Sequence, residues 1–250
     1  GPEKPFLPAE IETLEAALER GVRLLVALER DAEDGVLEPL LRRLGLRLDP
    51  TPLAHLRAHV PLTRTRADRS LIWSNRYSSH PSVTTMSRNE RLATVFSKTG
   101  ALEKLEAGPQ LEKAKLDVVL NAVEGTFADA DEDLEKDPDE PTGTFPLAAA
   151  LTRTSTQGKE AETRAFVLSD VDVLADELAK MVQGNLYLFG DAIYWLQVDR
   201  QPIVPAIDEK DVRIVHKAEE DALLFYGTSF GAPLLVLGAG ALATRRRRRR

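Results

Sequence analysis

The chain has 250 residues, 43% of them hydrophobic, and a formal net charge of −7. This length allows one or two domains with a sizeable core. The absence of cysteine excludes disulfides, thiolate metal sites and a cysteine nucleophile. The excess of acidic residues argues against nucleic acid as a partner of the folded domain.

The first fifty residues alternate between helical and strand patterns. A helix is expected from Pro8, because apolar residues recur on one face between charged ones. A nearly continuous apolar run, 22–28, is typical of a buried parallel strand. A second helix over 35–44 ends at Gly45, and a strand begins at Leu46. The alternation predicts a layered α/β fold of the amidotransferase or flavodoxin type, with a mostly parallel sheet and flanking helices.

The rest of the domain continues this pattern. Residues 129–142 are acidic and contain two prolines, so we expect a solvated loop there. No metal site is expected in the chain. We expect helices over 171–182 and 185–198. Short apolar runs predict further strands at 70–73, 92–96, 115–121, 145–152 and 164–168. A repeating pattern of strands and helices also calls for a strand before Gly1, so the domain is expected to be truncated at its N-terminus.

The C-terminal residues predict a membrane anchor. No charged side chain occurs in 222–244, and six arginines follow at 245–250. A membrane-spanning helix needs about 20 mainly apolar residues, and positive flanks stay in the cytoplasm. The expected anchor residues are Leu234, Leu235, Val236 and Leu237, with Arg245 and Arg246 beyond them. The alternative is a buried helix with a basic tail.

This interpretation divides the chain into four parts. They are an extracytoplasmic (periplasmic) α/β domain over 1–200, a linker over 201–221, a transmembrane helix over 222–244 and a cytoplasmic tail over 245–250. Gly227 and Gly231 have the spacing at which two membrane helices approach closely, so the anchor could also support a homo-oligomer.

Several short motifs resemble those of one family. The strand 21–28, the leucine-rich helix 37–46 and the acidic turn in 166–172 match its pattern, as do Ser78-Ser79-His80-Pro81, Gly184-Asn185-Leu186 and 192–196. Together they resemble the auxiliary, substrate-binding-like proteins of ABC transporters of the gliding-motility (GldG-like) type. The resemblance implies an extracytoplasmic α/β domain without ATPase activity or cofactor, whose partners are the permease and ATPase subunits.

The candidate ligand-binding residues follow a predicted strand. Ser169, Asp170 and Asp172 lie where α/β folds place ligand sites, and two carboxylates could hold a cation. The alternative is that Ser169 or Asp170 caps the next helix. His80, before Pro81, is either a loop residue or part of a ligand or partner site. His55 and His59 have the spacing of a metal pair, but further ligands are missing, which favours a solvated loop.

The sequence lacks two common catalytic motifs, which favours a non-enzymatic function. The sequence contains no Gly-x-Ser-x-Gly elbow and no Gly-x-x-x-x-Gly-Lys-Ser/Thr phosphate loop. We therefore expect a non-catalytic, membrane-anchored auxiliary component of an ABC-type transport system. The alternatives are an extracytoplasmic ligand-binding or sensor domain, and an enzyme completed by residues upstream of Gly1.

Overall fold

The computed structural model describes residues 6–30, 37–111, 113–154, 162–197, 225–231, 233–235, 237–239 and 245–246. The chain separates into two compact units, Gly1–Gln201 and Pro202–Arg250.

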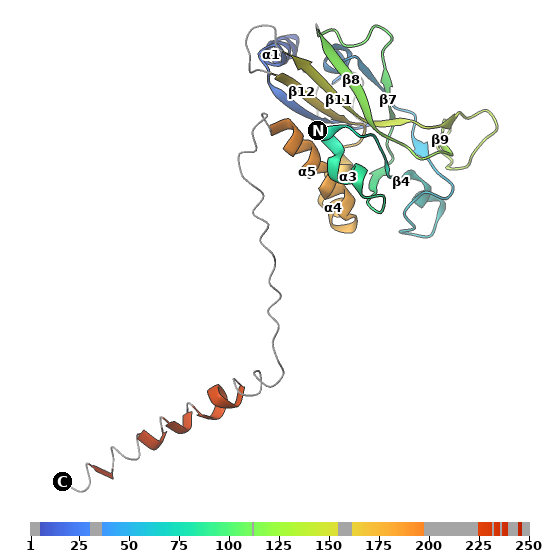
Figure 1. The fold of residues 1–250 in the computed structure, drawn as a ribbon. Helices are drawn as coiled ribbons and strands as arrows, with labels where there is room; N and C mark the ends of the chain where they lie inside the picture. The colour runs from blue at the N-terminus through green and yellow to red at the C-terminus, as the bar shows by residue number, and fades with distance from the viewer. Residues whose placement is uncertain are drawn as a thin grey trace. The chain divides into compact units, whose positions relative to one another are not determined.

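A five-stranded sheet lies at the centre of the first unit (Figure 1). Its strands follow the order β1 (Arg23–Ala27), β12 (Glu162–Leu168), β11 (Pro146–Thr154), β8 (Ala114–Asn121) and β5 (Arg76–Tyr77). Among the described residues, only the pairing of β1 with β12 is parallel; the other three pairings in this sheet are antiparallel. The strands β11 and β12 follow each other directly in the chain and pair from Ala148 opposite Leu168 to Thr154 opposite Glu162.

The predicted fold class is therefore wrong. The sheet is mixed and mostly antiparallel, and it is not the parallel layer of a flavodoxin-like fold. The misleading feature was the continuous apolar character of the strands. Central strands covered on both faces are apolar whatever their direction, so this character does not distinguish parallel from antiparallel pairing.

Smaller sheets extend the domain. Strand β2 (Leu46–Asp49) pairs with β7 (Ala101–Lys104), and β4 (Leu71–Ser74) pairs with β6 (Thr94–Ser97). A third sheet has the order β10 (Thr142–Gly143), β9 (Thr126–Ala128) and β3 (Leu53–Ala54). The short 3₁₀ turns of this unit are η1 (Arg66–Ser70), η2 (Pro81–Val83) and η3 (Asp172–Leu174).

Two hydrophobic cores cover the two faces of the main sheet. Helices α1 (Pro8–Glu19) and α2 (Glu38–Leu44) contribute to a core that contains Ala149, Leu151, Ala165 and Val167 from β11 and β12. Helices α3 (Thr84–Arg88) and α5 (Gln183–Gln197) contribute to the other core, which contains Ala148, Ala150, Phe166 and Leu168. The alternation along each strand follows from the two-residue period of side chains in a sheet. Helix α4 (Asp176–Met181) precedes α5.

The start of α5 is fixed by a glycine and an asparagine. A Cβ atom at Gly184 would lie 1.8 Å from the carbonyl oxygen of Ala93, so a larger residue would clash with the backbone. The side chain of Asn185, 1% exposed, accepts a hydrogen bond from the Val95 N–H at 2.9 Å. Its amide group donates to the carbonyls of Val95 and Val173 at 3.0 and 3.1 Å. These contacts join the helix to β6 and to the turn after β12.

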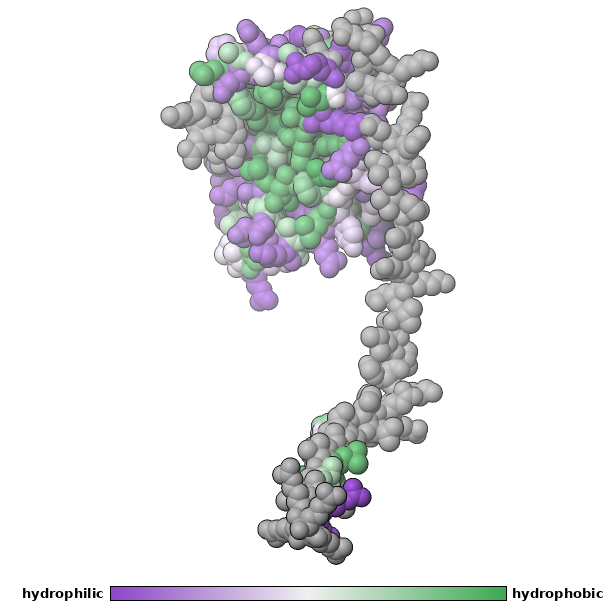
Figure 2. Space-filling view, turned by 90° about the vertical axis from the view of Figure 1, so that its left-hand side faces the viewer, coloured by the Kyte–Doolittle hydropathy of each residue, from purple (hydrophilic) through white to green (hydrophobic). Residues whose placement is uncertain are grey.

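The outer surface of α5 is apolar and aromatic. Its exposed large side chains are Leu186, Tyr187, Phe189 and Tyr194. Figure 2 shows an extended apolar area on the side of the domain that lies at the left of Figure 1. Exposed areas of this kind often mark interaction sites.

The predicted membrane anchor is contradicted. In the described residues, no helix has both the length and the apolar character needed to cross a bilayer. A π-helical turn spans Gly227–Gly231, and the side chains of Leu234, Leu235 and Leu237 are exposed. Repeated glycines and Pro233 disfavour a continuous α-helix. The predicted transmembrane pass, and the membrane location deduced from it, are therefore wrong. The linker 201–221, Val236 and most of the arginine tail lie outside the described residues.

Candidate metal centre

The loop between β9 and β10 is held at both ends. Ala128 N–H donates to the carbonyl of Pro141 at 3.1 Å, and Asp129 N–H donates to the carbonyl of Pro52 at 2.8 Å. Strand β9 also pairs with both β3 and β10. The first residue of the loop, Asp129, is consequently fully buried, with 0% of its surface exposed.

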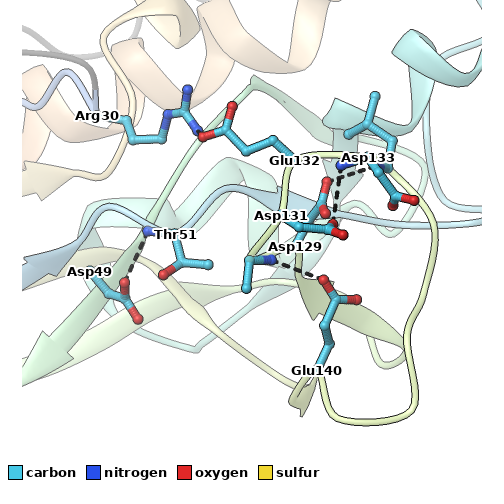
Figure 3. Close-up of polar contacts among 10 residues, drawn as sticks. Arg30, Asp49, Thr51, Asp129, Asp131, Glu132, Asp133 and Glu140 are labelled. Atoms are coloured by element: carbon cyan, nitrogen blue, oxygen red, sulfur yellow. Dashed lines mark hydrogen bonds and ion pairs between the residues drawn. The ribbon is translucent and has the colours of Figure 1, made fainter.

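Three aspartates of this loop gather around one space. One carboxylate oxygen each from Asp129, Asp131 and Asp133 lies within 4.8 Å of the others, and Figure 3 shows these side chains side by side. Asp131 and Asp133 are exposed, so an ion could reach the cluster from solvent.

The buried carboxylate of Asp129 is only half satisfied. Its Oδ2 accepts a hydrogen bond from Leu134 N–H at 2.9 Å. Its Oδ1 is buried, and no hydrogen-bond partner for it exists in the described residues. A buried polar atom normally has a partner, because leaving it without one costs roughly 1–3 kcal/mol. The Oδ1 atom of Asp129 can therefore accept a further ligand.

Local hydrogen bonds bend the loop around these carboxylates. Asp131 Oδ1 accepts from Asp133 N–H at 3.3 Å, and Asp133 Oδ1 accepts from Glu135 N–H at 2.6 Å. Glu132 and Leu134 take the left-handed conformation, with φ of 61° and 62°. That region is unusual for residues other than glycine, so the curvature is maintained against a local preference.

A fourth carboxylate closes the loop from its far end. Glu140 is 8% exposed, and its two oxygens accept from Ala130 N–H at 2.9 Å and Asp137 N–H at 3.0 Å. Figure 3 shows its side chain pointing toward the aspartate cluster. Lys136 Nζ donates to the carbonyl of Glu140 at 2.7 Å, so the lysine braces the loop backbone.

The electrostatics of the loop favour a bound cation. Residues 129–140 contain eight acidic residues and one lysine. Burial raises the pKa of Asp129, and the negative charges of Glu140, Asp131 and Asp133 raise it further, against the hydrogen bond from Leu134. The pKa of Asp137 is also raised, by desolvation first and then by the neighbouring carboxylates. A divalent cation would relieve this repulsion.

Three arginines tie the loop to distant segments. Arg30, which follows β1, forms an ion pair with Glu132 at 3.0 Å (Figure 3). Arg66 of η1 forms another with Glu135 at 3.0 Å. Arg69 Nη1, from the same turn, donates to the carbonyl of Leu134 at 2.7 Å. These contacts involve Glu132, Glu135 and Leu134, which are not among the three clustered aspartates.

The candidate residues after β12 are engaged in structural hydrogen bonds. Ser169 and Asp170 are buried, and the Ser169 hydroxyl contacts that of Thr99 at 2.8 Å. The Asp170 carboxylate accepts from Ser97 N–H at 2.7 Å and from Asp172 N–H at 2.8 Å. Burial raises its pKa to about 7. This geometry joins β6 to the turn η3, so it agrees better with the capping alternative than with an open ligand site.

His80 lies in a separate environment. Its Nδ1 accepts from Ser82 N–H at 3.2 Å and contacts the Ser82 hydroxyl at 2.8 Å, which caps the turn η2. Its ring packs edge-on against Trp195 of α5, with 5.2 Å between the ring centroids. Burial lowers its pKa. No hydrogen bond between described residues connects His80 with the Ser169–Asp172 turn.

His55 and His59 do not face each other as a metal pair. Nδ1 of His55 accepts from the N–H groups of Arg57 and Ala58 at 2.9 and 2.8 Å, and its Nε2 lies 3.1 Å from the carbonyl of Glu124. Nδ1 of His59 lies 2.9 Å from the carbonyl of His55. Both rings thus contact backbone groups of the loop after β3.

The acidic loop was not among the sites predicted from the sequence. The signal that could have found it is the alternation of aspartates at 129, 131 and 133, followed by acidic residues at 137 and 140. The burial of Asp129 was not visible in the sequence, because it depends on the pairing of β9 with β3, about 75 residues earlier in the chain.

Comparisons with known proteins give the fold alone. No family model and no curated protein matches the sequence. Among solved structures, the mmIFT52 N-terminal domain is similar, with a TM-score of 0.55 and 16% identity over 81% of this chain and 77% of that chain. Identity this low supports a shared fold and does not test the resemblance to the transporter auxiliary proteins.

Proposed function

We propose that this chain is a non-catalytic domain that binds a divalent metal cation on the loop 129–140. The observation that carries the proposal is the fully buried Asp129 carboxylate. It lies beside the carboxylates of Asp131 and Asp133, and its Oδ1 has no hydrogen-bond partner in the described residues. A cation bound there would satisfy this oxygen and neutralise part of the loop charge.

The donor atoms indicate the class of cation. The cluster offers carboxylate oxygens, and the chain has no cysteine. Carboxylate, carbonyl and water ligands suit the hard cations Mg²⁺, Ca²⁺ and Mn²⁺, whereas thiolate and imidazole favour zinc and copper. We therefore expect a hard divalent cation.

The test is calorimetric titration of the EDTA-treated protein with CaCl₂, MgCl₂ and MnCl₂. We expect one saturable site that is lost in Asp129→Asn, because the substitution removes the charge of the buried ligand. The control Asp176→Asn changes an exposed acid on α4, and this variant should bind the cation as the unmodified protein does. If none of the three cations produces a binding heat that saturates, the proposal is refuted.

A role as auxiliary component of an ABC-type transport system remains a separate proposal that rests on the motif resemblance. The exposed aromatic side chains of α5 are compatible with a protein partner such as the ATPase or permease subunit, because aromatic residues are enriched at interfaces. Co-purification of the chain with such subunits would support this role. Phe189→Glu should abolish the co-purification, whereas the control Glu177→Lys should leave it unchanged.

A further inference from the structure

We infer that the cation is Ca²⁺ and that residues 129–140 form a twelve-residue calcium loop of the EF-hand type, set between two β-strands instead of two helices. This inference rests on the proposed function and deepens it by naming the ion and its ligands.

Five of the eight acidic residues of the loop fall at the side-chain ligand positions of this register. EF-hand loops supply ligands from positions 1, 3, 5, 7, 9 and 12, with a backbone carbonyl at 7 and a bidentate glutamate at 12. With Asp129 at position 1, the aspartates Asp131, Asp133 and Asp137 occupy positions 3, 5 and 9. Glu140 occupies position 12, and the carbonyl of Glu135 stands at position 7. Every side-chain ligand position is therefore acidic.

The backbone agrees with this register. The sharp turn of the EF-hand loop falls at position 6, where glycine is the usual residue. Leu134 is at that position and takes the left-handed conformation, with φ of 62°. Its N–H donates to the buried carboxylate of position 1 at 2.9 Å. The loop has thus adopted the turn that the register requires, although a leucine occupies it.

Glu140 lies at the far end of the loop, outside the group of three aspartates. Its buried carboxylate is held by Ala130 N–H and Asp137 N–H. Ca²⁺ accepts six to eight oxygen ligands, including bidentate carboxylates, whereas Mg²⁺ demands near-ideal octahedral geometry. A bidentate glutamate at position 12 would therefore favour Ca²⁺.

The register can be tested with neighbouring acids of the same loop. Asp137→Asn removes the charge of a ligand at position 9, whereas Asp139→Asn removes the same charge from position 11, which supplies no ligand. In calorimetric titration of the full chain with CaCl₂, we expect Asp137→Asn to weaken binding about tenfold and Asp139→Asn to change it less than about twofold. Circular dichroism of the metal-free variants checks that each one is folded.

The identity of the ion is tested by Glu140→Asp. The shorter side chain cannot bind bidentately from position 12, so Ca²⁺ affinity should fall about tenfold or more while Mg²⁺ affinity changes little. For the unmodified chain we expect Ca²⁺ binding with a Kd between about 10⁻⁶ and 10⁻³ M, at least about tenfold tighter than Mg²⁺.

The outcomes separate the two proposals. If no cation binds, the proposed function fails, and the calcium loop fails with it. If Mg²⁺ binds as tightly as Ca²⁺, or if Asp139→Asn weakens binding as much as Asp137→Asn, the calcium loop is wrong while cation binding by the domain stands.

Discussion

The guanidinium group of Arg69 donates to the carbonyl of Leu134 at 2.7 Å, which joins the turn η1 to the middle of the acidic loop. The backbone carbonyl of the same arginine accepts from His55 N–H at 3.0 Å. One residue thus connects the candidate calcium loop to the segment that follows β3. An ion that fixes Leu134 should also restrain this segment.

The first prediction concerns this connection. Saturating Ca²⁺ should slow amide hydrogen exchange in a peptide covering 55–70, because exchange reports local opening. Arg69→Ala should keep Ca²⁺ binding but lose the protection of 55–70, whereas Arg88→Ala, an exposed arginine of α3, should retain it. Equal protection of 55–70 in the Arg69 and Arg88 variants would show that the Arg69–Leu134 hydrogen bond does not couple ion binding to this segment.

The second prediction concerns pH and cation affinity. Burial and neighbouring carboxylates raise the pKa of Asp129, so protons compete with the cation as the pH falls. In the metal-free protein this group stabilises the fold below its ordinary pKa, and that stability is lost as the pH rises through the raised pKa. The increase in Tm on adding Ca²⁺ should therefore be larger at pH 7.5 than at pH 5. Asp129→Asn should show no increase at either pH.

The third prediction concerns Asp170. Burial raises the pKa of Asp170 to about 7, so folding takes up a proton between its ordinary range and neutrality. Its contribution to stability is present below pH 4 and is lost as the pH rises toward 7, a change on the order of 3–4 kcal/mol. Urea unfolding at pH 4.5 and pH 8 measures this change.

The control for this titration is Asp170→Asn. The variant should be less stable at low pH, because only one of its side-chain atoms can still accept a hydrogen bond. Its stability should nevertheless vary less with pH than that of the unmodified protein. An identical pH dependence in both proteins would mean that Asp170 has an ordinary pKa.

The fourth prediction concerns the start of α5. Gly184→Ala places a Cβ 1.8 Å from the carbonyl oxygen of Ala93, so we expect a loss of at least about 2 kcal/mol. Gly190→Ala in the same helix meets nothing within 4 Å and should stabilise by about 0.5–1 kcal/mol. Denaturant unfolding of the two variants provides the comparison, and similar effects would contradict the close approach at Gly184.

The fifth prediction concerns Asn185. Replacement by leucine leaves the buried N–H of Val95 and two carbonyls without their partner, which should cost roughly 2–4 kcal/mol. Asn185→Asp should also destabilise, because a carboxylate cannot donate to the carbonyls of Val95 and Val173. A change below 1 kcal/mol in denaturant unfolding of the leucine variant would show that water replaces these contacts.

Local patterns in the sequence identified most elements of the main sheet. The apolar run 22–28 contains β1, and the runs 145–152 and 164–168 correspond to β11 and β12. The helices at 8–19 and 183–197 also lie where apolar periodicity placed them. Periodicity succeeds here because it reports which side chains are buried, and burial of a face is a local requirement of each element.

Local sequence patterns are sufficient for the order and type of the main elements, the acidic character of 129–140 and the spacing of its carboxylates. The direction of the strands and the burial of Asp129 follow from the tertiary structure. Both depend on partners far apart in the chain: β1 pairs with β12 across more than a hundred residues, and β9 pairs with β3 to close the loop. Such pairings are chosen by the packing of the whole domain, so no local pattern carries them.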